Sequence, residues 1–196
     1  MVASIVVVVA YLLGTFPTAL LVAGRRGVDP TTAGSGNPGA TNVMRTAGKA
    51  AGALTLVGDV AKGAAAAGLG WAVGGRALAI LCGTAAIVGH IAPVTRRFRG
   101  GKGVATGFGV TVTILPVAVV AAAVWFYVVR GVVGRPTVLS EAGIVTLPVV
   151  AAVMGVTAGE LAVLTLCAAV ILLRIWTGRE RPEQATWQAA ASAADS

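Results

Sequence analysis

Long apolar runs alternate with short polar stretches along this chain. Residues 2–23 form an apolar run of about 20 residues, which is long enough to cross the hydrocarbon core of a bilayer as a helix. Arg25 and Arg26 follow this run directly, and similar runs begin near residues 50 and 77. The pattern therefore predicts an all-α, polytopic membrane protein.

The positions of the positive charges decide how the later runs are divided. A single span over residues 104–129 would place Arg130 and Arg135 outside, although loops rich in Lys and Arg stay in the cytoplasm. Pro116 allows two short, tilted or partly inserted helices instead. We therefore expect seven transmembrane or partly inserted segments, which comprise residues 2–23, 50–73, 77–95, 104–115, 117–129, 141–156 and 160–175. A six-segment arrangement, with these arginines outside, is the alternative.

On the seven-segment arrangement, every one of the 15 Lys and Arg residues except Arg76 and Lys62 lies on the cytoplasmic side. Residues 74–76 then form an outer turn. We expect one membrane-embedded domain over residues 1–182. The remaining residues, 183–196, are rich in Ala, Gln, Ser and Asp and predict a disordered tail.

The composition agrees with a membrane protein and excludes other classes. The chain is 57% hydrophobic and 11% charged, with a mean hydropathy of +0.88, far more apolar than a soluble domain. Its net charge of +8 does not indicate nucleic acid, because the basic residues lie between apolar runs, where topology and anionic lipid explain them. Cys82 and Cys167 lie inside apolar segments and predict no disulfide framework.

Residues 34–45 are the longest stretch without apolar periodicity, and they predict a binding loop. Gly34, Gly36 and Gly39 allow a tight backbone whose N–H groups can form an anion-binding nest. Side-chain donors and a guanidinium suited to phosphate complete the set, namely Ser35, Asn37, Thr41, Asn42 and Arg45. A simple cytoplasmic turn is the alternative, since turns use the same residue types.

Residues 95–106 form a second loop of the same kind on the same side of the membrane. Gly100, Gly101 and Gly103 surround Lys102 and let the backbone approach a ligand, which distinguishes this lysine from ordinary cations. The neighbouring Arg96, Arg97 and Arg99 are typical of topology anchors. Two such loops predict two anionic groups, although neither loop fits a dinucleotide or ATP motif in its required strand-to-helix context.

Charged residues inside the second span allow two interpretations. Asp59 and Lys62 are one helical turn apart, so they can form a structural ion pair, although charges inside membranes often mark functional sites. His90 is the only histidine and is either a hydrogen-bonded core residue or part of the site. The sequence has no cluster of Cys and His that indicates a metal, and we expect no cofactor.

Two long motifs resemble the PlsY family of bacterial membrane acyltransferases. They read SGNPGATNVMR followed by GDVAKG, and GHIAPVTRRFRGGKGVATG, and the resemblance covers about residues 10–110. It implies a seven-helix enzyme of the bacterial inner membrane, with its site facing the cytoplasm, that transfers an acyl chain from acyl phosphate to the 1-hydroxyl of glycerol 3-phosphate. Phospholipid biosynthesis and contact with membrane lipid follow from that activity.

The resemblance also implies roles for particular residues. Ser35, Asn37, Arg45 and Lys102 match catalytic positions, and the remaining loop residues and His90 are expected to bind substrate. The third family motif, a His and an Asn three residues later, is absent. Anchoring on Gly178 and Glu180 puts Ala168 and Ile171 at those positions.

Two other function classes are compatible with these features. An anion transporter also uses broken helices and glycine loops, but it is expected to show repeated halves and a midplane site, whereas the cations here lie at one face. A catalytically impaired paralogue acting as a membrane scaffold would explain the absent third motif.

The charge distribution makes a direct prediction about topology. Cysteines introduced at Arg97 and Arg135 should be protected from an impermeant thiol reagent in intact cells, while a cysteine at Gly75 should be labelled. Labelling at position 135 but not 97 would contradict the seven-segment arrangement and favour a single span across Pro116.

Overall fold

A computed structural model describes residues 1–116, 148–149, 152–153 and 155–177. Its main helices are α1 (Val2–Gly14), α2 (Thr18–Gly24), α3 (Ala40–Ala47), α4 (Lys49–Ile91), the 3-10 helix η1 (Val94–Arg96), α5 (Val104–Ile114) and α8 (Ala158–Thr177). The all-α prediction is confirmed for these ranges, which contain no strand. The segments 117–129 and 141–156, and the tail 183–196, lie wholly or largely outside the described residues, so the count of seven stays a prediction.

The first apolar run is divided into two helices. We expected one span over residues 2–23, but α1 ends at Gly14 and α2 begins only at Thr18. Pro17 causes the break because it lacks an N–H donor and disfavours a helical conformation at the residue before it. The break exposes the carbonyl group of Phe16, which accepts a hydrogen bond from Lys62 Nζ at 3.1 Å.

Helix α4 is a hairpin of two apolar arms. Gly74 and Gly75 interrupt it with non-helical backbone angles, and Gly75 has a φ of 68°. The predicted turn at residues 74–76 is therefore confirmed, and the two arms correspond to the expected spans 50–73 and 77–95. The arms approach closely near this turn, since a Cβ at Gly70 would lie 2.6 Å from the carbonyl oxygen of Leu78.

Glycines allow the neighbouring helices to pack closely against α4. A Cβ at Gly63 would clash with the carbonyl oxygen of Thr106 on α5, and one at Gly109 on α5 would clash with that of Val60. A Cβ at Gly14 on α1 would clash in the same way with Ala86. Small residues at helix contacts are typical of bilayers, where close van der Waals packing replaces the hydrophobic effect as the force between helices.

The outward faces of the helices are apolar. The ranges Val2–Gly24 and Lys49–Arg96 are long and apolar enough to cross a membrane, with hydropathies of 2.4 and 1.9. Large apolar side chains point away from the bundle along α1, including Val2, Ile5, Val8 and Leu12. Both cysteines are free, as expected.

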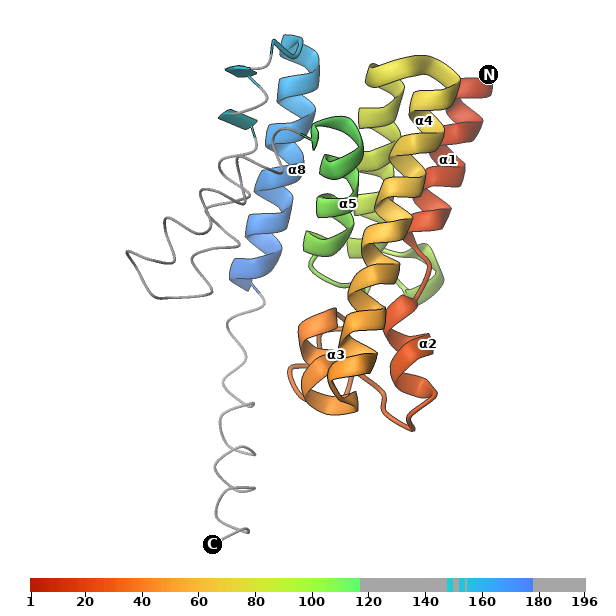
Figure 1. The fold of residues 1–196 in the computed structure, drawn as a ribbon, viewed down its shortest axis with the longest axis vertical. Helices are drawn as coiled ribbons and strands as arrows, with labels where there is room; N and C mark the ends of the chain where they lie inside the picture. Colours follow the sequence, from red (N-terminus) through yellow and green to blue (C-terminus); the bar gives the residue numbers. More distant parts are fainter. Residues whose placement is uncertain (117–147, 150–151, 154, 178–196) are drawn as a thin grey trace, which may run out of the picture.

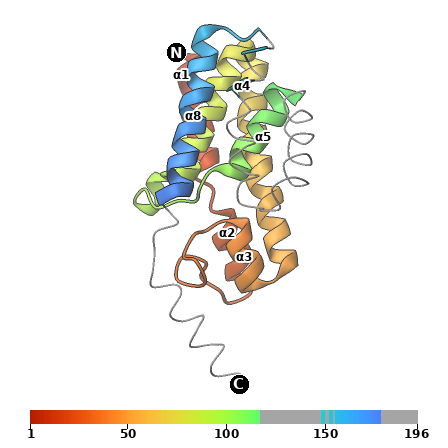
Figure 2. The same cartoon turned by 90° about the vertical axis from the view of Figure 1, so that its left-hand side faces the viewer.

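Short helices and loops gather at one end of this bundle. Figures 1 and 2 both show α2 and α3 beside the start of α4, at the end of the bundle to which the loop after α4 and the C-terminal end of α8 also point. Segments far apart in sequence thus meet at that end.

The close contact between α4 and α5 makes a prediction about stability. Gly63→Ala should lower the free energy of unfolding by about 1–3 kcal/mol, because the added methyl group must push α5 away. Gly68→Ala in the same helix is the matched control, since nothing lies within 4 Å of its Cβ position. Unfolding of the purified proteins in detergent measures both. Equal stability of the two variants would contradict the close packing.

Candidate active site

A cavity of about 260 Å³ lies where both predicted loops meet the last described helix. The first loop contributes Ser35, Gly36, Asn37 and Pro38, and the second contributes Gly100, Gly101 and Lys102. Helix α8 closes the cavity with Arg174 and Thr177. The structure thus brings together two cations and several polar side chains from three separate parts of the chain.

The buried side chain of Asn42 organises the first loop. Its amide nitrogen Nδ2 donates to the carbonyl oxygens of Pro30 at 2.9 Å and Ala33 at 3.0 Å, and its Oδ1 accepts from the N–H of Ser35 at 2.8 Å. A Cβ at Gly34 would clash with the same Oδ1. Asn42 was expected to bind substrate, but these hydrogen bonds direct its amide into the loop.

Three backbone amides of this loop are bonded within it. The N–H of Gly36 donates to Ala33 at 3.1 Å and that of Gly39 donates to Asn37 at 2.8 Å, while the N–H of Ser35 is held by Asn42. These donors are therefore directed into the loop. The side chains of Ser35 and Asn37 remain as the loop's polar contribution to the cavity.

The turn that precedes this loop is closed by Asp29. Its carboxylate Oδ1 accepts hydrogen bonds from the hydroxyl of Thr31 at 2.7 Å and from the N–H of Thr31 at 2.8 Å. The hydroxyl, followed by the N–H, holds the pKa of Asp29 below its usual value, because both bonds favour the ionised carboxylate. Asp29 is therefore ionised at neutral pH, and its carboxylate closes the turn.

The second half of the first predicted loop is a helix. Residues 40–47 form α3, and both Thr41 and Arg45 are exposed on it. Neither residue lines the cavity to which Lys102 contributes. Periodicity did not reveal α3 because it is short, polar and preceded by glycines.

The second loop folds back onto the end of α4. The N–H of Gly100 donates to the carbonyl oxygen of Ile91 at 3.0 Å, and the N–H of Gly101 donates to that of His90 at 3.1 Å. Gly103, with a φ of 85°, then begins α5. The amides of Gly100 and Gly101 are thus bonded to α4, while both glycines line the cavity beside Lys102, which is the loop's contribution of positive charge.

Arg174 is a charged site residue that the sequence analysis missed. It lies in the last turn of α8, and its Nη2 donates to the carbonyl oxygen of Ile91 at 3.0 Å. The guanidinium has five N–H donors, so this one bond leaves others for the cavity that Arg174 lines. The only local signal was a cation at the end of an apolar helix, which is also typical of a topology anchor.

The two positions of the absent third motif lie one to two turns earlier on α8. Ala168 and Ile171 are buried, with exposed fractions of 7% and 5%. Ile171 belongs to the apolar core and lies near Gly107 of α5, since its Cδ1 is 3.3 Å from the Cβ position of that glycine. Glu180 lies outside the described residues. Helix α8 therefore contributes apolar packing where the family motif has polar groups.

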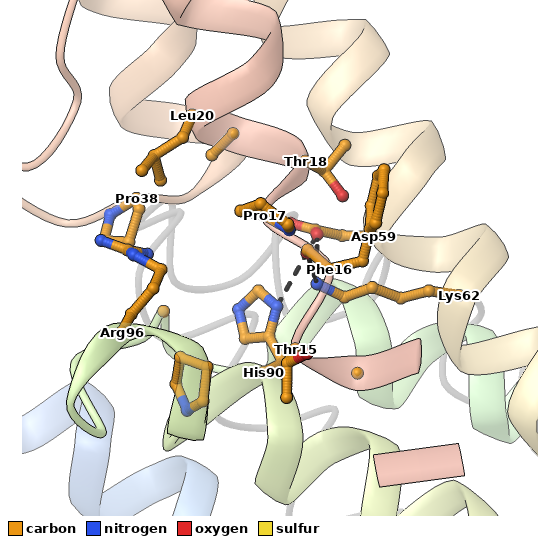
Figure 3. A pocket seen from close by; sticks show the side chains of 14 residues that line it. Thr15, Phe16, Pro17, Thr18, Leu20, Pro38, Asp59, Lys62, His90 and Arg96 are labelled. Carbon is orange, nitrogen blue, oxygen red and sulfur yellow. Dashed lines mark hydrogen bonds and ion pairs between the residues drawn. The ribbon is translucent and has the colours of Figure 1, made fainter. Parts of the chain in front are cut away.

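Figure 3 shows a buried cluster formed by Asp59, Lys62 and His90. Lys62 Nζ is 2.8 Å from Asp59 Oδ1, which confirms the predicted ion pair, and His90 Nδ1 is 3.6 Å from the same oxygen. The cluster lines a small second cavity together with Thr15, Thr18 and Arg96. Pro38 of the first loop and Gly101 of the second loop line both cavities, so the cluster lies next to the first cavity.

The described part of the chain holds no group of three or more His, Cys, Asp or Glu side chains that could bind a metal ion. The segment around Thr15–Thr18 was not expected near the site, and it comes close because the break after Gly14 turns the chain beside α4. Arg96 of the second loop, which is typical of a topology anchor, also lines the second cavity.

Fold and site together define a class, an all-helical membrane protein with a cation-lined cavity at one end of its bundle. The model of the family described as glycerol-3-phosphate acyltransferase matches residues 4–185. The chain belongs to this family, as the two sequence motifs predicted.

Individual relatives agree with the family. A glycerol-3-phosphate acyltransferase of Rubrobacter xylanophilus is 50% identical over 57% of this chain and 57% of its own length. One from Clostridioides difficile is 39% identical over 90% of this chain and 93% of its own length. The chain thus spans less than two thirds of the Rubrobacter protein and nearly all of the Clostridioides protein.

The fold is that of a solved membrane enzyme. The crystal structure of PlsY, an integral membrane glycerol 3-phosphate acyltransferase, in its glycerol 3-phosphate form superposes with a TM-score of 0.83. The two are 30% identical, and the match covers 92% of this chain and 95% of PlsY. The prediction of an integral membrane protein is thereby confirmed.

The network around Asn42 makes a prediction about stability. Asn42→Asp keeps the shape of the side chain but turns a carboxylate oxygen toward the carbonyl groups of Pro30 and Ala33, so the free energy of unfolding should fall by at least about 2 kcal/mol. Thr41→Ala, on the exposed face of α3, should change it by less than about 0.5 kcal/mol. An Asp variant as stable as the wild type would show that the loop does not depend on Asn42.

Proposed function

We propose that this protein transfers an acyl chain from acyl phosphate to the 1-hydroxyl of glycerol 3-phosphate, giving lysophosphatidic acid. The observation that carries this proposal is the cavity in which Lys102 and Arg174 lie with Ser35 and Asn37. Two substrates that both carry phosphate repel each other, and two cations beside neutral donors offset that repulsion. Membership of the glycerol-3-phosphate acyltransferase family supports this reading.

The proposed reaction requires no enzyme nucleophile, because an acyl phosphate is already activated. The hydroxyl oxygen of glycerol 3-phosphate attacks the acyl carbon and forms the ester bond. The bond from that carbon to the phosphate oxygen breaks, and inorganic phosphate leaves. Lys102 and Arg174 stabilise the negative charge that collects on the leaving phosphate, and the loops hold the two reactants in contact.

The hydroxyl proton goes to a substrate phosphate oxygen in this proposal. Ala168 and Ile171 offer no proton acceptor on α8, and both are buried in apolar surroundings. A general base contributes only about 10²–10⁴-fold, whereas neutralisation of two anions is required before any reaction. The chemistry therefore depends on positioning and charge.

In this proposal the acyl chain reaches the cavity through the apolar part of the bundle. A long acyl chain is insoluble in water, so it would lie among the helices and enter from the bilayer, while both phosphates stay at the charged end. We place that end at the cytoplasmic face of the bacterial inner membrane, because Lys and Arg residues gather there. Arg45, exposed on α3 at this end, can contact an entering substrate without lining the cavity.

One assay tests this function against transport. Purified wild-type protein in detergent should form lysophosphatidic acid from palmitoyl phosphate and glycerol 3-phosphate. Detergent micelles enclose no compartment, so transport cannot produce the signal. Absence of product from a folded, monodisperse preparation would refute the proposed activity.

The two cations of the cavity make a quantitative prediction. Lys102→Met and Arg174→Met should each lower kcat/KM by about 10²-fold, the scale expected when a preorganised charge-stabilising group is removed. Arg97→Gln is the matched control, since this exposed cation of the same loop lines neither described cavity, and it should stay within about threefold of wild type. Near-normal turnover of both Met variants would show that these cations serve only as topology anchors.

A further inference from the structure

The side chain of His90 lies between a buried carboxylate and the second loop. Its Nδ1 is 3.6 Å from Asp59 Oδ1. Its opposite edge faces Gly101, because a Cβ at that glycine would clash with His90 Nε2 and would lie 3.0 Å from Cε1 and 3.2 Å from Cδ2. The imidazole therefore fills the space directly beneath Gly101, the residue before Lys102.

The carboxylate that faces His90 is itself held in place. Asp59 Oδ1 is 2.8 Å from Lys62 Nζ, and Lys62 donates to the carbonyl oxygen of Phe16 at 3.1 Å. Asp59, Lys62 and His90 are 2%, 8% and 9% exposed, so none of them can rotate into solvent without opening the bundle. Figure 3 shows the three side chains converging beside the break between α1 and α2.

We infer that His90 is a positioning residue. Asp59 orients its imidazole, the imidazole supports the backbone at Gly101, and Lys102 is thereby held in the substrate cavity. The imidazole contacts the loop and lines only the second cavity, whereas Lys102 lines the first. His90 thus acts on the reaction through the loop. The functional part of this inference rests on the proposed acyl transfer.

The two adjacent glycines of the loop provide a matched test of this contact. The three atoms nearest to a Cβ at Gly101 all belong to the side chain of His90, whereas a Cβ at Gly100 clashes with the backbone carbonyl oxygen of His90 and lies 2.6 Å from that of Ile91. Shortening the side chain at position 90 therefore relieves the first clash and leaves the second unchanged.

The shortening variant is His90→Asn, because the asparagine amide can occupy the place of Nδ1 beside Asp59 while the ring atoms beneath Gly101 are removed. Gly101→Ala alone should lower kcat/KM by about tenfold or more and lower the unfolding temperature. The double variant Gly101→Ala/His90→Asn should recover both to the level of His90→Asn alone. Gly100→Ala should lower kcat/KM and the unfolding temperature to the same extent whether position 90 holds His or Asn. His90→Ala repeats the comparison if the Asn variant folds poorly.

His90→Asn by itself separates positioning from proton transfer. Loss of a positioning residue should lower kcat/KM by less than about tenfold, whereas loss of a general base should lower it by about 10²–10⁴-fold. A loss near a thousandfold in folded His90→Asn would make His90 a catalytic base and overturn the inference, as would additive effects in the Gly101 double variant. If the wild type forms no lysophosphatidic acid, the proposed function fails, and recovery of the unfolding temperature still decides whether Gly101 rests on His90.

Discussion

Carbonyl groups at the C-terminus of α4 hold the site together. The last carbonyls of any helix lack intrahelical partners, and here those partners come from other segments. The carbonyl of Ile91 accepts from Gly100 and from Arg174, that of His90 accepts from Gly101, and that of Ala92 accepts from the hydroxyl of Tyr11 at 2.9 Å. One helix end thus fixes α1, the second loop and α8, and the last two of these form walls of the cavity.

The same end of the bundle accommodates charge within an apolar protein. Burial of Asp59 and Lys62 is costly, and their contact with each other and with Phe16 offsets part of that cost. Close packing at Gly14, Gly63 and Gly109 keeps the helices near enough for such long-range contacts. Small residues in the membrane part and polar contacts at its end therefore support each other.

Positive charge takes a large part in the proposed chemistry because the third family motif is absent. Ala168 and Ile171 pack in the core, while Arg174, on the following turn, reaches the cavity. In the proposed reaction the acyl donor is already activated, so the reactants need orientation and neutralisation more than a strong base. The protein thus combines family loops with a last helix that contributes a cation.

Features that depend on neighbouring residues were determined by the sequence itself. Apolar runs predicted the helices of α1, α4 and α8, the division between two of these runs predicted the turn at residues 74–76, and the spacing of Asp59 and Lys62 predicted their ion pair. Long motifs were specific enough to identify the family. Only the tertiary structure decided that Asn42 organises the loop, that the amides of Gly100 and Gly101 bind α4, and that Arg174 joins the cavity. Arg174 and its partner Ile91 are 83 residues apart. Local periodicity cannot predict a contact over that separation, because the contact forms only when the helices pack and bring the ends of α4 and α8 together.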